Sequence, residues 1–204
     1  MPVAYINLNN LRANYLQLSQ MAGDKKIIAV IKANAYGHGL CEVASALPQA
    51  HAFAVARIED AILLRQHAIM QRIIVLTGVY TASDLALAAE NNIDLVVHSE
   101  HHLNWLQAYT TEHKFDIWLK VDTGMHRLGF RPNDVPAAVA KLRSCKQVAN
   151  IRLLSHFASA DDINNPSNAM QIEEFSNLPA LEKSFANSAA FVNYPDLDSD
   201  WPRI

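Results

Sequence analysis

Seven short apolar runs recur along the chain, and each is predicted to form a buried strand. The runs are rich in Ile, Val, Leu and Phe and do not alternate with polar residues, which is typical of strands covered on both faces, as in a parallel sheet. They lie at residues 27–31, 52–56, 72–76, 94–97, 116–121, 151–154 and 184–187.

Stretches with the helical spacing of apolar residues separate these runs. An N-terminal segment at 4–18 precedes the first run, and a polar stretch at 158–168 predicts a long surface loop. Successive predicted strands begin 20 to 35 residues apart, which suits βα units with right-handed crossovers and predicts an α/β fold. The predicted helices are 58–65, 83–90, 101–109, 135–142 and 170–178.

The strand count favours a barrel over an open sheet. No Gly-x-Gly-x-x-Gly turn follows any predicted strand, as an open dinucleotide-binding sheet would require. A complete (β/α)8 TIM-type barrel takes about 250 residues, and this chain has 204. We therefore expect one barrel domain over residues 1–204, with 1–20 preceding the first strand, truncated before or at its eighth strand near 201–204. Such a barrel would expose two strand edges.

Composition narrows the range of partners and compartments. The chain is 50% hydrophobic and 18% charged with a formal net charge of −3, which is ordinary for a globular protein. The lack of a basic cluster argues against nucleic acid or an anionic membrane as a partner. No apolar stretch exceeds five residues, the start has no signal-peptide pattern, and Cys41 and Cys145 lie 104 positions apart. We expect reduced thiols and a cytoplasmic location.

Reactive side chains at the ends of predicted strands are the candidates for chemistry, because barrel active sites gather at the carboxyl ends of the strands. This filter selects Lys32, Lys120, His156 and Ser188. A lysine at the end of a buried strand is partly desolvated, which favours its neutral, nucleophilic form. The alternative is that Lys32 extends to solvent from the strand end.

Three further patterns have both a functional and an ordinary interpretation. Arg127 suits a carboxylate or phenolate ligand, or a surface salt bridge. The triplet at 122–124 (Asp-Thr-Gly) matches the catalytic loop of aspartic proteases, but those are all-β, so a tight turn is favoured. The histidines at 98, 101 and 102 could suggest a metal, but a solvated helix start capped by Ser99 explains them better. We expect no metal site.

Four motifs, in this order, resemble the N-terminal barrel of bacterial alanine racemase. The resemblance runs through the whole chain and implies a pyridoxal-phosphate enzyme that interconverts L- and D-alanine for peptidoglycan synthesis. The motifs are AVIKANAYGHG from Ala29, LKVDTGMHRLGF from Leu119, LLSHFASAD from Leu153 and ANSAA from Ala186.

The resemblance also implies roles for the residues in these motifs. Lys32 would bind the cofactor as a Schiff base and act as the catalytic base on one face of the substrate. Tyr36 and Ser188 would hydrogen-bond the cofactor phosphate. Arg127 would reach the cofactor's phenolic oxygen and the substrate carboxylate. Lys120 would be carbamylated, which makes it an anion able to orient Arg127.

At the end of the chain, the resemblance implies that His156 hydrogen-bonds Arg203, that Arg203 faces the pyridine nitrogen, and that Ile204 also belongs to the cofactor site. Because an arginine does not give up its proton, that nitrogen would stay unprotonated, which favours reprotonation at Cα over transamination. The family continues with a β-rich C-terminal domain, absent here, that supplies the opposite-face tyrosine across a homodimer. We therefore expect the isolated chain to be inactive or severely impaired. The alternatives are a racemase of another or broader substrate range and a non-catalytic cofactor-carrying barrel.

Overall fold

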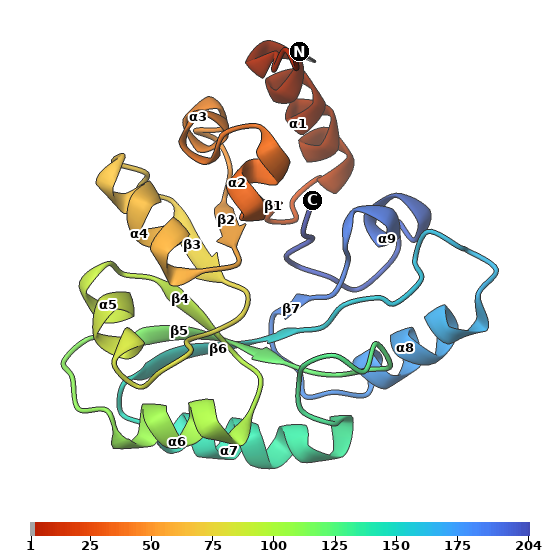
Figure 1. Cartoon of the computed structure of the whole chain (residues 1–204). Coiled ribbons are helices and arrows are strands. Elements are labelled where there is room, and N and C mark those ends of the chain that lie inside the picture. The colour runs from red at the N-terminus through yellow and green to blue at the C-terminus, as the bar shows by residue number, and fades with distance from the viewer. Residues whose placement is uncertain (1–2) are drawn as a thin grey trace.

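Seven parallel strands follow one another in chain order and form one curved sheet (Figure 1). The computed structural model describes residues 3–204. Every predicted apolar run contains a strand, so the parallel α/β prediction is confirmed. The strands are β1 (Ile28–Val30), β2 (Ala52–Val55), β3 (Arg72–Val75), β4 (Asp94–Val97), β5 (Phe115–Lys120), β6 (Val148–Leu154) and β7 (Lys183–Ser184).

Helices surround the sheet and connect its strands (Figure 1). The five predicted helices correspond to α4–α8. The N-terminal segment forms α1, and the short helices α2, α3 and α9 were not predicted. The bounds are α1 (Leu8–Ala22), α2 (Lys32–Gly37), α3 (Leu40–Ala46), α4 (Ile58–Gln66), α5 (Asp84–Glu90), α6 (Glu100–Ala108), η1 (Pro132–Asp134), α7 (Val135–Ser144), α8 (Pro166–Ser176) and α9 (Ser188–Asn193).

The predicted loop at 158–168 is too long, because α8 begins inside it. The side chain of Asn165 accepts a hydrogen bond from the backbone N–H of Ser167 and caps the helix, and Pro166 occupies the first helical position. Both residues are typical of a helix start. The cap and the proline therefore place the first turn of α8 where polar composition indicated a loop.

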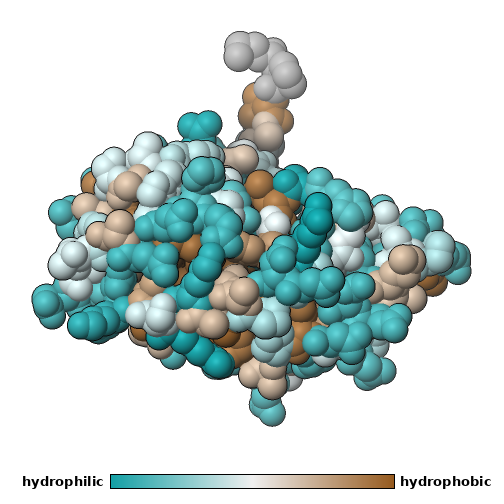
Figure 2. Space-filling view, turned by 90° about the horizontal axis from the view of Figure 1, so that it is seen from below, coloured by the Kyte–Doolittle hydropathy of each residue, from teal (hydrophilic) through white to brown (hydrophobic). Residues whose placement is uncertain are grey.

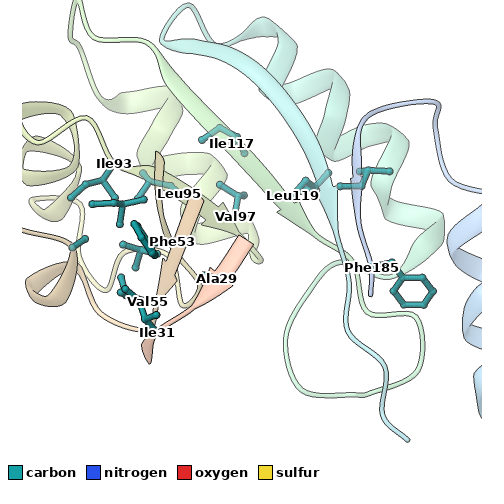
Figure 3. Close-up of a cluster of buried hydrophobic side chains, with 14 of the residues drawn as sticks. Ala29, Ile31, Phe53, Val55, Ile93, Leu95, Val97, Ile117, Leu119 and Phe185 are labelled. Atoms are coloured by element: carbon teal, nitrogen blue, oxygen red, sulfur yellow. The ribbon is translucent and has the colours of Figure 1, made fainter. Parts of the chain in front are cut away.

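Each strand buries both of its faces, in two separate apolar clusters. In β1, Ala29 belongs to the large cluster between sheet and helices, whereas Ile28 belongs to a smaller cluster with Trp118 and Trp201. Figure 3 shows part of the large cluster, with Phe53 and Val55 of β2 in it. Because successive side chains point to opposite faces of a strand, the smaller cluster is the interior of the barrel. This double burial explains why the strand sequences do not alternate.

Residues 200–204 connect the two ends of the sheet. Their backbone bonds to β1 on one side and to β7 and the residues after it on the other, and Arg203 forms a parallel bridge with Ile28. The expected stop at the eighth strand holds, but the expected pair of open edges is wrong along this segment, because 200–204 supplies partners to both neighbours. The bonds run from Ile28 N to Pro202 O (2.9 Å), Val30 N to Ile204 O (2.7 Å), Ile204 N to Ile28 O (3.0 Å), Trp201 N to Lys183 O (3.0 Å) and Arg203 N to Ala186 O (2.9 Å).

Hydrophilic and apolar residues are interspersed on the face seen in Figure 2. The segment that follows the grey N-terminal residues projects from the body there, and Tyr5 within it is 92% exposed. None of the helices in residues 3–204 has the length and apolar character needed to cross a bilayer.

Candidate active site

A cavity of about 460 Å³ opens at the carboxyl ends of the strands. All eight residues assigned to the site from sequence line this one cavity, although they are spread from residue 32 to residue 204. They are Lys32, Tyr36, Lys120, Arg127, His156, Ser188, Arg203 and Ile204.

A left-handed turn follows β1 and carries the first two of these side chains. Residues 33–36 all have φ between 51° and 55°, although none of them is glycine. L-residues rarely adopt this conformation, because Cβ approaches the following carbonyl oxygen. The turn leaves Tyr36 61% exposed and places the Nζ of Lys32 6.0 Å from the centroid of the Tyr36 ring.

Asn34 anchors this turn to α3. Its backbone carbonyl accepts a hydrogen bond from the N–H of Gly39 (3.0 Å), and its side-chain Oδ1 accepts one from the N–H of Leu40 (2.8 Å). Asparagine tolerates the left-handed region better than most residues, because its short side chain bonds locally. Sequence patterns did not reveal the turn, since an Ala-Asn-Ala-Tyr stretch has no period that distinguishes one handedness from the other.

Arg203 lies at the floor of the cavity and is only 4% exposed. Its Nη1 donates to the carbonyl (2.8 Å) and the hydroxyl (2.7 Å) of Ser184, and its Nη2 donates to the carbonyls of Ser155 (2.6 Å) and Phe185 (3.3 Å). Burial lowers the pKa of Arg203 to about 10, so the guanidinium remains charged at neutral pH. Among the described residues, no acceptor is found for its Nε.

His156 follows β6 and contacts the same guanidinium. The Nη2 of Arg203 lies 3.1 Å from the Nδ1 of His156, so the contact implied by the resemblance is present. Since a guanidinium only donates, Nδ1 must accept, which leaves the ring hydrogen on Nε2. Burial, then the charges of Arg203, Lys120, Arg127 and Lys32, lower the pKa of His156 to about 3. The imidazole is therefore neutral at physiological pH.

Lys120 ends β5 and lies close to other cations. Burial, and then the charges of Arg203 and Arg127, hold the pKa of Lys120 well below its ordinary value. Its Nζ has no hydrogen-bond partner among residues 3–204, and neither has the guanidinium of Arg127. The surface salt bridge considered for Arg127 is thus not found in the described part of the chain.

The lining of the cavity has a one-sided charge. It contains four basic side chains, those of Lys32, Lys120, Arg127 and Arg203, and no carboxylate among the residues that the structure describes. Like charges held together without a counter-ion are costly, and such sites are associated with function. The arrangement suits a ligand that carries several negative groups.

The sequence analysis missed the apolar part of the lining. Val30, Leu76 and Leu154 contribute, and so does Asn187, whose side chain accepts from the N–H of Ala190 and caps α9. The strand-end filter selected only reactive side chains. Applied to every residue that follows an apolar run, it would have found Ala56 and Thr77 as well.

The histidine cluster at 98–102 lies beside the cavity and outside its lining. His98 Nε2 lies 3.0 Å from the carbonyl of Thr77, and His102 Nε2 lies 2.9 Å from that of Val79. The expected solvated helix start is wrong for His102, which is 5% exposed. Burial lowers its pKa to about 4. Within residues 3–204, no group of three His, Cys, Asp or Glu side chains is placed to hold a metal.

Comparison with known proteins gives one consistent result. Residues 6–204 match the family described as "Alanine racemase, N-terminal domain". The chain is 44% identical to the alanine racemase of Photobacterium profundum and 42% identical to that of Vibrio cholerae, over 98% of this chain in each case. These alignments cover 57% and 56% of the relatives, so the chain spans little more than half of their length.

Solved structures agree with this result. The biosynthetic alanine racemase of Pseudomonas aeruginosa superimposes with a TM-score of 0.92 at 40% identity, over 97% of this chain and 56% of that one. The alanine racemase of E. faecalis superimposes with a TM-score of 0.90 at 29% identity, over 97% and 57%.

Proposed function

The chain belongs to the family of alanine racemase N-terminal domains, and we propose that it is the cofactor-binding barrel domain, over residues 1–204, of a pyridoxal-phosphate-dependent alanine racemase. The observation that carries the proposal is the cavity of about 460 Å³ lined by four basic side chains and no carboxylate of the described residues. The cofactor has a phosphate and a phenolate, and alanine adds a carboxylate. These anionic groups would match the unbalanced charge.

The residues present suit these groups one by one. The hydroxyls of Tyr36 and Ser188 would hold the phosphate, and the planar fork of Arg127 would reach the phenolate and the substrate carboxylate. Arg203 has an Nε–H without an acceptor among residues 3–204, and this group would donate to the ring nitrogen. Ile204 would contact the cofactor beside it.

Pyridoxal phosphate, when bound, supplies an aldehyde for a lysine amine and a ring that withdraws electrons from the substrate Cα. Lys32 is the one cavity lysine at the end of β1, and its amine would hold the cofactor and then move the proton at Cα on the face that it reaches. Arg203 would keep the ring nitrogen unprotonated, because five hydrogen bonds to Ser184, Ser155, His156 and Phe185 fix its charged guanidinium. That limits the electron withdrawal and favours return of the proton to Cα.

Lys120 would complete the charge balance as a carbamate. Its neutral amine attacks carbon dioxide, an N–C bond forms and one proton leaves, so a cation becomes an anion. The low pKa of Lys120 supports this step, since only the unprotonated amine reacts. The carbamate would accept a charge-assisted hydrogen bond from Arg127 and orient it.

Racemisation also needs an acid or base on the opposite face of Cα. We propose that a segment outside residues 3–204, belonging to a second copy in a homodimer, supplies that group. The substrate proposed is alanine, as the names of the relatives indicate.

Cofactor binding tests the proposal most directly. The chain incubated with pyridoxal phosphate should develop a visible absorption band, and Lys32→Ala should abolish it. Lys114→Ala, which removes an exposed lysine far along the chain, is the matched control and should keep the band. A band of equal strength in Lys32→Ala would overturn the assignment of Lys32.

Exchange of the α-proton separates the candidate activities. In D₂O, the loaded chain should exchange the α-proton of one alanine enantiomer faster than that of the other, because Lys32 reaches one face. Binding without any exchange would favour a carrier, and faster exchange with a larger amino acid would favour another substrate.

A further inference from the structure

A cluster of buried polar side chains lies behind the cavity and joins three elements that the site uses. Thr123 follows β5, Ser155 follows β6, and Gln171 lies in the middle of α8. They are 6%, 1% and 1% exposed. None of the three lines the cavity, and the proposed reaction assigns none of them a role.

Gln171 is the centre of this cluster. Its Nε2 donates to the hydroxyl of Thr123 (3.2 Å) and to the carbonyl of His156 (3.1 Å), and its Oε1 accepts from the N–H of Ala158 (2.9 Å). Both amide hydrogens are therefore used, one on the loop after β5 and one on the loop after β6. A buried polar group with all its donors used fixes the groups that it contacts.

The direction of the remaining hydrogen bonds follows from the donors available. The hydroxyl of Ser155 lies 2.8 Å from the carbonyl of Val121, which only accepts, so Ser155 donates there. Thr123 must then donate to Ser155 (2.9 Å) and accept from Gln171. The chain of donors runs from Gln171 through Thr123 and Ser155 to β5. Ser155 also presents its own carbonyl to Nη2 of Arg203 at 2.6 Å.

The Asp-Thr-Gly triplet at 122–124 fits into this cluster residue by residue. Asp122 Oδ1 accepts from the N–H groups of Gly124 (3.1 Å) and His126 (2.9 Å), which shapes the loop leading to Arg127. Gly124 has φ +135°, and a Cβ there would lie 3.2 Å from Cγ of Gln171. The glycine is needed both for its backbone angle and for the space that Gln171 occupies.

We infer that Gln171 is a positioning residue of the active site: from α8 it holds the carbonyl of His156 and the base of the Arg127 loop, and thereby sets the contact between His156 and Arg203. The meaning of this for catalysis rests on the proposed function, but the positioning itself is a property of the cofactor-free chain and is tested there.

The test measures the imidazole of His156 by ¹⁵N NMR in the 204-residue chain without cofactor, with the resonances assigned through His156→Gln. In the wild type, the ring should be a single Nε2–H tautomer with a strongly lowered pKa. In Gln171→Leu, the ring should lose its fixed contact with Arg203. We expect a mixture of tautomers and a rise in the pKa of His156 of about one unit, the lower end of the effect of a neighbouring charge.

Gln147→Leu is the matched control. Gln147 is also buried, and its Nε2 also donates twice, to the carbonyls of Leu106 and Tyr109, but it precedes β6 at the opposite end of the barrel. It should lower stability by a similar amount and leave the tautomer and pKa of His156 unchanged. An unchanged His156 in Gln171→Leu, or an equal change in Gln147→Leu, would overturn the inference.

Thr123 provides a second route if Gln171→Leu does not fold. Thr123→Val keeps the shape but removes the acceptor for Gln171 and the donor to Ser155, so His156 should again become mobile, and Thr123→Ser should restore it. No effect of Thr123→Val on His156 would count against the inference. The cofactor band lost in Lys32→Ala reports separately on the proposed function, so the two ideas fail in different experiments.

Discussion

The two ends of the barrel interior carry similar numbers of charged groups but treat them differently. At the amino ends of the strands, three cations and three carboxylates form a continuous set of ion pairs. At the carboxyl ends, four basic side chains share one cavity with no carboxylate among the described residues. The amino-end set is Lys26, Arg72, Arg152, Asp94, Asp116 and Glu182.

The paired end stabilises the fold. Arg72 binds both Asp94 and Asp116, and the indole of Trp118 donates to Asp94 at 2.9 Å. The guanidinium of Arg152 lies over the rings of Trp118 (5.3 Å) and Trp201 (5.5 Å). Aromatic rings and ion pairs thus close the barrel together. The unpaired end stabilises nothing by itself and is explained only by a ligand that supplies the missing charge.

The largest expected effect comes from breaking the paired end. Asp94→Ala leaves Arg72 with one partner and the indole of Trp118 with none, in a site where Asp94 is 7% exposed. Removing one member of a buried pair typically costs about 3–5 kcal/mol, and urea unfolding at pH 7 should show a loss of that order. Glu100→Ala, which breaks an exposed pair with Lys141, is the control and should cost less than about 1 kcal/mol. Similar losses in both variants would contradict the comparison.

The two ends should also respond to pH in opposite directions. Burial raises the pKa of Asp94 from 3.8 to about 6, so between these values the folded state binds the proton more strongly, and the Asp94 contribution rises as pH falls. The pKa of His156 drops from 6.5 to about 3. There the unfolded state binds the proton more strongly, so the His156 contribution is lost as pH falls.

Unfolding free energies measured between pH 7 and pH 4 check these signs. Relative to the wild type, His156→Gln should gain about 2–3 kcal/mol over this range, and Asp94→Asn should lose on the order of 2 kcal/mol. The exposed His67→Gln serves as the control. Curves of the two variants that shift in the same direction would refute the assignment.

Sequence alone predicted the part of the molecule that repeats. Every strand was found because double burial leaves an uninterrupted apolar run such as 27–31 or 52–56. The closure by 200–204 was not found, because hydrogen bonding to β1 and β7 leaves no pattern in so short a segment.

The site divides in the same way. Reactive side chains at strand ends, such as Lys32 and His156, follow from the rule that barrel sites gather there. The resemblance, rather than the pattern, added Tyr36, Arg203 and Ile204. The positioning contacts of Gln171 could not be predicted, because they join α8 to two loops distant in sequence.

A smaller effect of opposite sign is expected at the unpaired end. Lys120→Met removes a buried amine that has no partner among residues 3–204 and repels Arg127 and Arg203. We expect a gain in unfolding free energy of about 1–2 kcal/mol in buffer free of carbon dioxide, together with weaker cofactor binding, as at other functional sites. Lys146→Met on the surface should change stability by less than about 0.5 kcal/mol. A loss of stability in Lys120→Met would mean that this amine is already neutralised.

The smallest effect concerns the backbone at the same end. Ala33 is exposed and has φ 52° within the left-handed turn that carries Lys32 and Tyr36. Left-handed geometry costs an L-residue about 1–2 kcal/mol, and glycine avoids this cost but loses about 0.5–1 kcal/mol of unfolded-chain entropy. Ala33→Gly should therefore stabilise the chain by about 0.5–1 kcal/mol.

Ala140→Gly measures the opposite case, because Ala140 is exposed in the right-handed helix α7, where the same change costs about 1 kcal/mol. Thermal unfolding of the two variants should thus give shifts of opposite sign. Destabilisation by both would show that the turn at 33–36 relaxes to a right-handed form without cofactor, and the strain would then be a consequence of the ligand instead of a property of the unpaired end. Stabilisation by Ala33→Gly alone would show that this end carries backbone strain in addition to unbalanced charge before any ligand is bound.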